Sequence, residues 1–147
     1  MAHARQSIRD DIVTTLTGLA TTGSRVFRNR VYPIAEGKLP GLLIFTDAEE
    51  IEPSTVTPPR TQMRRLTVVV EAYVKAVSNY DQTLDTISEQ VEEALAADVT
   101  RNGLAKDTRI TAFESEFSGE GDQPVAIGRS SIEIVYVTKE DAVNQSV

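Results

Sequence analysis

The stretch Arg65-Leu66-Thr67-Val68-Val69-Val70-Glu71-Ala72-Tyr73-Val74-Lys75 decides the fold. Its even-numbered residues from Leu66 to Val74 are all apolar, so they share one face of an extended chain. β-branched and aromatic residues fill the run, and neither Gly nor Pro interrupts it. The pattern predicts the central strand of a sheet with one dry face. The other face is mixed, because only half of its residues are apolar: Thr67, Val69, Glu71 and Tyr73.

Two segments on either side of this strand have apolar residues at helical spacing. The first is predicted to begin at Ser7 and to end at Thr21-Thr22-Gly23. The second is predicted to follow Asn79, which is a suitable N-cap. Its apolar face would consist of Leu84, Ile87, Val91, Ala94 and Leu95.

Further strands are expected before and after the second helix. Alternating or continuous apolar runs predict them at Arg25–Val31, Leu42–Thr46, Arg109–Phe117 and Val125–Thr138. Two amphipathic helices need one apolar surface, and the even-numbered face of the central strand supplies it. The expected fold is therefore an α+β two-layer sandwich, with a mainly antiparallel four- to five-stranded sheet and both helices on one face. The opposite face carries enough apolar area to suit a subunit contact.

The segment from about 47 to 62 is the least ordinary part of the chain. Acidic residues dominate its first limb and basic residues its end: Asp47, Glu49, Glu50 and Glu52, then Arg60, Arg64 and Arg65. A connection of this length inside a compact domain is unusual and is often functional. It is either a long hairpin arm that projects toward a neighbour or a solvated hairpin tip.

The chain is expected to form a single domain over residues 1–147, with flexible ends at about 1–5 and 140–147. It contains no cysteine, which indicates a reducing compartment. No apolar run approaches the roughly 20 residues that cross a bilayer, and the N-terminus lacks a signal-peptide pattern. A soluble product without a membrane partner is expected.

Charge is distributed unevenly along the sequence. The net charge is −7; residues 1–65 contribute +2 and residues 66–147 contribute −9. Tight binding to nucleic acid depends on neutralising phosphates, so an acidic chain is a poor candidate for it. An acidic surface would let DNA slide past without capture, and it would equally serve solubility.

No set of residues indicates a reaction, a metal site or a cofactor. His3 is the only histidine and lies in the expected N-terminal tail, so a histidine-based triad or metal site is not expected. The acidic groups lack the spacing and central Gly of a calcium loop. The Gly119-Glu120-Gly121 sequence is followed by a strand, whereas a phosphate loop needs a helix there.

The order of these elements resembles the tail terminator (minor tail) proteins of bacteriophages with long non-contractile tails. The likeness covers roughly residues 7–138 and includes three runs: Arg30-Val31-Tyr32-Pro33-Ile34, Leu39-Pro40-Gly41-Leu42-Leu43-Ile44-Phe45-Thr46, and the central strand from Arg64 to Tyr73. The acidic, proline-containing arm lies between the last two runs.

The resemblance implies a structural virion protein without catalytic residues. Such a subunit would form a ring, expected to be a hexamer, that caps the tail tube, ends tube polymerisation and offers a surface for head attachment. Its partners would be copies of itself, the tail tube protein and a head–tail connector protein, and DNA would only pass through the lumen. It would be assembled in the host cytoplasm and end in the virion tail.

From the residues themselves we infer a subunit or tube interface on the arm and the mixed sheet face. The candidate residues are Glu49, Glu50, Glu52, Arg60, Arg64, Arg65, Glu71 and Tyr73. Arginines of one subunit are expected to meet carboxylates of the next. Two alternatives are a head–tail connector or tail-completion protein, and a small enzyme or ligand-binding domain in which Tyr32 and Tyr73 line a pocket.

Overall fold

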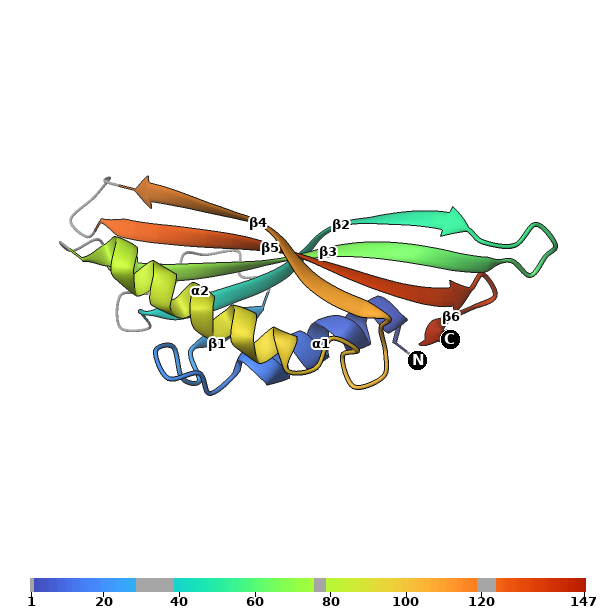
Figure 1. Ribbon diagram of the computed structural model, residues 1–147, viewed down its shortest axis with the longest axis horizontal. Helices are drawn as coiled ribbons and strands as arrows, with labels where there is room; N and C mark the ends of the chain where they lie inside the picture. The colour runs from blue at the N-terminus through green and yellow to red at the C-terminus, as the bar shows by residue number, and fades with distance from the viewer. Residues whose placement is uncertain (1, 29–38, 76–78, 119–123) are drawn as a thin grey trace.

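The computed structural model describes residues 2–28, 39–75, 79–118 and 124–147 and shows a sheet covered by helices on one face (Figure 1). In chain order the elements are α1 (Ala4–Leu16), β1 (Val26–Arg28), β2 (Gly41–Pro53), β3 (Thr61–Lys75), α2 (Tyr80–Ala96), β4 (Asp107–Ser118), β5 (Val125–Lys139) and β6 (Ala142–Ser146).

The sheet has the strand order β1-β2-β3-β5-β4, and β6 pairs with β5. All its pairings are antiparallel except that of β1 with β2. The predicted α+β two-layer sandwich is confirmed, and so is the central position of the strand from Arg65 to Lys75. The sheet has one strand more than expected, because β6 lies in the C-terminal end.

The even-numbered face of β3 forms the floor of the core. Leu66, Val68 and Val70 are at most 2% exposed. The neighbouring strands extend this floor with buried aliphatic side chains at paired positions, such as Ile132 opposite Val68. Burial of so many branched side chains is the main favourable term for folding.

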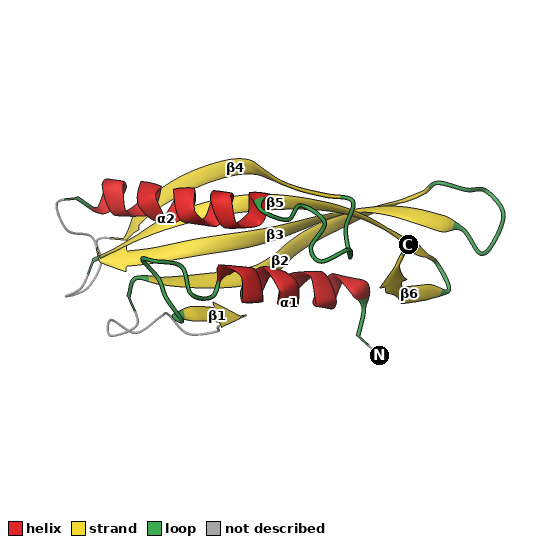
Figure 2. Cartoon of the chain, turned by 60° about the horizontal axis from the view of Figure 1, so that its bottom comes forward, coloured by secondary structure: helices red, strands yellow, loops and turns green. Residues whose placement is uncertain are grey.

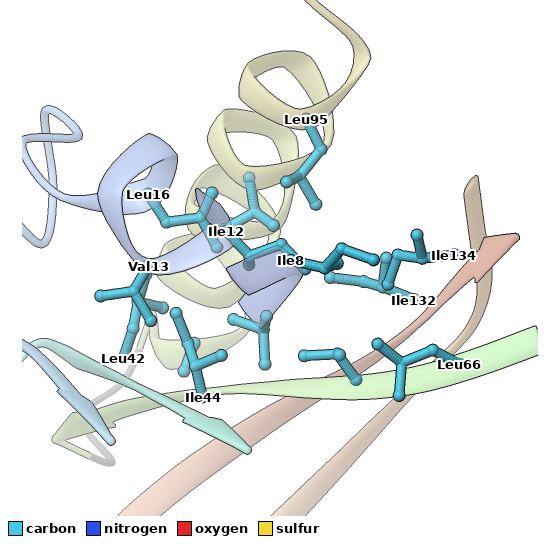
Figure 3. Packing of buried hydrophobic residues seen from close by; sticks show 14 of the residues in the cluster. Ile8, Ile12, Val13, Leu16, Leu42, Ile44, Leu66, Leu95, Ile132 and Ile134 are labelled. Atoms are coloured by element: carbon cyan, nitrogen blue, oxygen red, sulfur yellow. The ribbon is translucent and has the colours of Figure 1, made fainter. Parts of the chain in front are cut away.

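Both helices pack on that floor, as Figures 1 and 2 show. The apolar stripe of α1 consists of Ile8, Ile12 and Leu16, all 0% exposed. In Figure 3 these side chains meet Leu42 and Ile44 of β2 on one side and Ile132 and Ile134 of β5 on the other. The predicted stripe of α2 is also confirmed, with Leu84, Ile87, Val91 and Leu95 buried.

The expected boundaries of the first helix are wrong at both ends. Helix α1 begins at Ala4, which is buried, so part of the predicted flexible end at 1–5 is helical. His3 is its N-cap, and its side chain accepts a hydrogen bond from the Arg5 backbone N–H at 3.0 Å. The helix ends at Leu16 because Gly18, with φ +96°, follows at a backbone conformation that glycine readily adopts.

The C-terminal end also differs from the expectation of a flexible tail at 140–147. Residues Ala142–Ser146 form β6, which pairs with β5 at Thr138 and Lys139. Strand β4 pairs with β5 only from Val125 to Val135, so β6 covers the same edge of β5 farther along. Backbone hydrogen bonding, which needs no apolar side chain, explains why a polar sequence forms this strand.

The segment at 47–62 is a regular β-hairpin for most of its length. Strand β2 continues to Pro53 and β3 begins at Thr61, so only residues 54–60 lie outside the strands. Figures 1 and 2 show this end of the hairpin extending well past both helices. We refer to residues 47–62 as the arm. The connection between the two strands is therefore much shorter than the sequence suggested, because the two limbs of the arm pair with each other residue by residue.

Several sequence features lie outside the described residues, including Arg30, Tyr32 and the turn at Gly119–Asp122. Among the described residues, neither helix has the length and apolar character that crossing a membrane would require.

The core assignment predicts very different costs for truncating two isomeric side chains. Leu66→Ala should lower the free energy of unfolding by about 2–5 kcal/mol, because Leu66 is fully buried and the surrounding side chains close the cavity only in part. Ile51→Ala should cost about 1 kcal/mol or less, because Ile51 is 47% exposed. Urea unfolding followed by circular dichroism measures both, and equal costs would contradict this placement of the core.

Candidate subunit interface

A single extra residue at the base of the arm decides which acidic side chains are buried. The pairing of β2 with β3 shifts between Thr46 and Ala48, so Asp47 is a β-bulge. Because side chains alternate across a strand, a shift of one residue exchanges the two faces. Beyond the bulge Glu49 pairs with Leu66 on the helix-covered face, whereas Glu50 pairs with Arg65 on the open face.

Glu49 is the centre of a buried charged cluster. Its side chain is 4% exposed and accepts hydrogen bonds from Arg64 Nη1 at 2.9 Å, from Arg5 and from the Tyr136 hydroxyl. Arg64 is also buried, and it donates further to Thr138 Oγ1 and Gln62 Oε1, both at 2.9 Å. The Glu49 carboxylate and the Arg64 guanidinium therefore satisfy each other where little water reaches, whereas Arg5 binds the same carboxylate from the partly exposed side.

This cluster joins four separate elements at the root of the arm. Arg5 comes from α1, Glu49 from β2, Arg64 from β3 and Tyr136 from β5. Burial, together with the hydrogen bond to Glu49, raises the pKa of Tyr136, so its hydroxyl remains a donor at neutral pH. The arm is thus held to the body of the molecule by side chains as well as by the sheet.

Two of the predicted interface residues are therefore already paired within one chain. Arg64 meets the carboxylate of Glu49 in its own subunit. Glu50 and Glu52 are exposed on the arm, where a neighbour can reach them. Contacts of any of these residues between subunits stay a prediction.

Arg65 lies on the open sheet face, in the part of the chain that leads from the arm. Its Nη1 is 3.7 Å from Glu133 Oε1, and Arg109 Nη2 is 2.9 Å from the same oxygen. The side chains of Arg65 and Arg109 are 42% and 62% exposed, so the pairs are surface ion pairs that stabilise little by themselves.

Glu71 and Tyr73 lie together at the other end of the open face. The Tyr73 hydroxyl donates to Glu71 Oε1 at 3.0 Å, and Arg129 Nε donates to Glu71 Oε2 at 2.7 Å. Burial and the neighbouring Glu71 carboxylate raise the pKa of Tyr73 to about 12. The hydrogen bond to Glu71 is also the main reason that the pKa of Arg129 is raised.

Arg60 is at the end of the arm, next to the turn between β5 and β6. Its backbone N–H donates to Glu140 Oε1 at 2.8 Å, and its Nη1 lies 3.4 Å from both carboxylate oxygens. The structure therefore divides the eight predicted residues among the arm, the buried cluster at its root and two ends of the open face.

Sequence reasoning missed the partners that complete these groups, namely Arg5, Arg109, Arg129, Tyr136 and Glu140. The strand register is the signal that would have found one of them, since Arg129 is directly opposite Glu71. Two further arginines, Arg25 and Arg28, also pair within the chain. Arg25 donates to the Pro40 and Thr21 carbonyls, and Arg28 pairs with Asp10.

Chemically, these groups are hydrogen-bonded charge pairs that can orient the arm and recognise complementary charge. Among the described residues, no three His, Asp or Glu side chains are grouped so that they could hold a metal ion.

Comparison with known proteins adds little to this picture. No protein-family model matches the sequence, and no curated protein matches it. Among solved structures, a chain described as "Virion of native gene transfer agent (GTA) particle" is similar with a TM-score of 0.36 and 12% identity, over 90% of this chain and 92% of that chain. A likeness of this degree does not assign a function.

The buried cluster predicts that replacing two adjacent glutamates by alanine lowers the stability by very different amounts. Glu49→Ala should lower the free energy of unfolding by about 3–5 kcal/mol, because it leaves the Arg64 guanidinium buried without its counter-charge. Glu50→Ala should change it by about 0.5 kcal/mol or less, because Glu50 is exposed. Chemical denaturation of both variants tests this, and a similar loss in the two would show that Glu49 is not buried as described.

The role of His3 as the N-cap of α1 predicts that the protein loses stability on mild acidification. Burial and the nearby Arg5 and Arg64 lower its pKa from 6.5, against a smaller opposing effect of Glu49, and the neutral ring is the form that caps α1. A depressed pKa means that the stabilisation is complete above pH 6.5 and is lost as pH falls through the folded-state value.

The sole histidine permits a direct measurement by NMR titration of its ring signals. We expect a pKa below 6.5. The His3→Asn variant, which keeps an N-capping acceptor but does not titrate, should lose less stability over the same pH range. Identical pH profiles for the wild type and this variant would contradict the prediction.

Proposed function

We propose that this protein is a structural subunit of a phage-like virion that assembles into a homo-oligomeric ring, as a tail terminator does. In this proposal the ring, a hexamer, caps the tail tube, ends tube polymerisation and offers a surface for attachment of the head. The observation that carries the proposal is a sheet with both described helices on one face, an open second face and a projecting arm (Figure 2).

The open face supports a contact with another protein because it mixes apolar and charged side chains. Phe45 and Val69 are paired near its middle, and Val135 and Val137 follow on β5. Three of these four remain partly exposed, and Val69 is buried by its neighbours. Apolar area bordered by hydrogen-bonded charges is the usual composition of a subunit interface.

The arm supports a ring because it extends beyond the layer formed by the helices. A contact between an arm and a different surface of the next subunit is heterologous, and it closes into a ring when the rotation permits. The buried cluster around Glu49 and Arg64 would hold the arm in one direction, so that each subunit presents it at the same angle. Exposed Glu50 and Glu52 would then meet basic groups of the neighbour.

The proposal includes the remaining properties expected of such a subunit. It has no enzymatic activity, and its partners are the tail tube protein and a head–tail connector protein. Its acidic character, −7 overall, would let DNA pass through the lumen without specific binding. The subunit would be assembled in the host cytoplasm and reside in the virion tail.

The ring proposal predicts a specific response to charge reversal on the arm. The wild type should show the mass of a closed oligomer by light scattering and a ring in negative-stain micrographs. The double variant Glu50→Arg/Glu52→Arg should raise the concentration for half-assembly about tenfold or more, equivalent to about 1.4 kcal/mol per subunit contact.

The matched control is Glu89→Arg/Glu92→Arg, which makes the same change of charge on exposed positions of α2. It should assemble as the wild type does. A single-chain mass at every concentration would contradict a ring that forms in solution, and equal weakening by both double variants would contradict the role of the arm. Binding to the portal end of heads, without binding to tube ends, would favour a head–tail connector.

A further inference from the structure

The outer edge of β4 has the features of a strand-binding site. Strand β4 is the last in the sheet order, and within the described residues no strand pairs with its outer edge. Every residue from Ala112 to Phe117 is exposed, and this segment contains no Pro or Lys, residues that often protect an edge strand. Its backbone N–H and C=O groups can therefore pair with another extended chain.

The two faces of this edge differ sharply in chemistry. Phe113 and Phe117 lie on the helix-covered face and are 43% and 54% exposed. Phe113 packs over Gly128, where an added Cβ would lie 3.2 Å from the ring, and Phe117 packs against Tyr80 with ring centroids 5.7 Å apart. Both rings are thus anchored on the protein and still offer apolar area to a ligand.

The opposite face of the same edge is acidic. The side chains of Glu114 and Glu116 are 74% and 61% exposed, and they lie 3.9 Å and 3.5 Å from the guanidinium of Arg129. Arg129 is already bonded to Glu71 at 2.7 Å, so three carboxylates share one arginine. The two outer carboxylates are exposed enough to pair with basic side chains of another molecule.

We propose that the Ala112–Phe117 edge binds an extended segment of another protein, in which basic side chains alternate with apolar ones. Main-chain hydrogen bonds would add this segment to the sheet as a further strand. Since side chains alternate in an extended chain, its apolar residues would lie beside Phe113 and Phe117 while its Lys or Arg residues lie beside Glu114 and Glu116.

A second copy of this chain fits the edge poorly. Antiparallel pairing of β4 with itself about Ser115 would place Phe113 opposite Phe117, which is favourable, but also Glu114 opposite Glu116. That arrangement brings four carboxylates together, and like charges directly opposite each other destabilise a sheet. The acidic residues therefore select against self-association and for a basic partner. The edge is also distinct from the arm on which the proposed ring contact depends.

Two synthetic peptides test the inference on the full-length protein. One is a seven-residue peptide of alternating Lys and Val, and the other has Glu in place of every Lys. Fluorescence anisotropy should show the Lys–Val peptide binding at least about tenfold more tightly, with weaker binding at high salt. Amide NMR signals of Ala112–Phe117 should shift on its addition.

Charge reversal provides the decisive comparison. Glu114→Lys/Glu116→Lys should invert the preference, so that the Glu–Val peptide binds more tightly, whereas Glu89→Lys/Glu92→Lys on α2 should keep the wild-type preference. Equal binding of both peptides, an unchanged preference in the first variant or NMR shifts confined to other strands would overturn the proposal. Dimers that the Lys–Val peptide dissociates would also overturn it, by showing that a second copy occupies the edge.

The result of the peptide-binding test can be distinguished from the result of the test of the ring. Light scattering of the Glu114→Lys/Glu116→Lys variant reports whether it still assembles, independently of which peptide it binds. Equal binding of the two peptides by a wild-type protein that assembles, or an unchanged preference in an assembled variant, would reject only the β4 site. Peptide binding by a protein that stays monomeric would reject only the ring.

Discussion

A single layer of helices on a two-faced sheet is the constraint from which the rest of the structure follows. The even-numbered side chains of β3 from Leu66 to Val74 form a continuous apolar row, and α1 and α2 together cover it. No described helix covers the other face, so the polar side chains on that face pair with one another or with water. The hydrophobic core therefore lies on one side of the sheet, and the contacts proposed with other molecules lie on the other side and at the edges.

The bulge at Asp47 connects this layered architecture with the charges of the arm. Without it, the even-numbered acids would follow Leu42 and Ile44 onto the helix-covered face. The extra residue instead turns Glu49 inward, where two arginines and a tyrosine can neutralise and bond it. One buried carboxylate thereby ties α1 to three strands, and its acidic neighbours remain at the surface.

The three surfaces proposed to bind other molecules differ in their chemistry. The open face presents branched side chains among exposed ion pairs, the arm presents acids on a stiff hairpin, and the β4 edge presents backbone with aromatic and acidic borders. A subunit that meets copies of itself and other virion proteins would need separate surfaces for separate partners. Distinct chemistry at each surface would keep those contacts from competing.

Local pattern in the sequence determined the two helices, five of the strands and the buried face of β3 and α2. The alternation from Leu66 to Val74 and the helical spacing in α2 were sufficient to predict which side chains are buried. The reason is that the period of apolar residues can be seen in a short stretch of sequence. Only the tertiary structure decided that His3 caps a helix, that Ala142–Ser146 is a strand, and that Glu49 rather than Glu50 is buried. Those outcomes depend on register, on a one-residue bulge and on partners far away along the chain, none of which a local pattern contains.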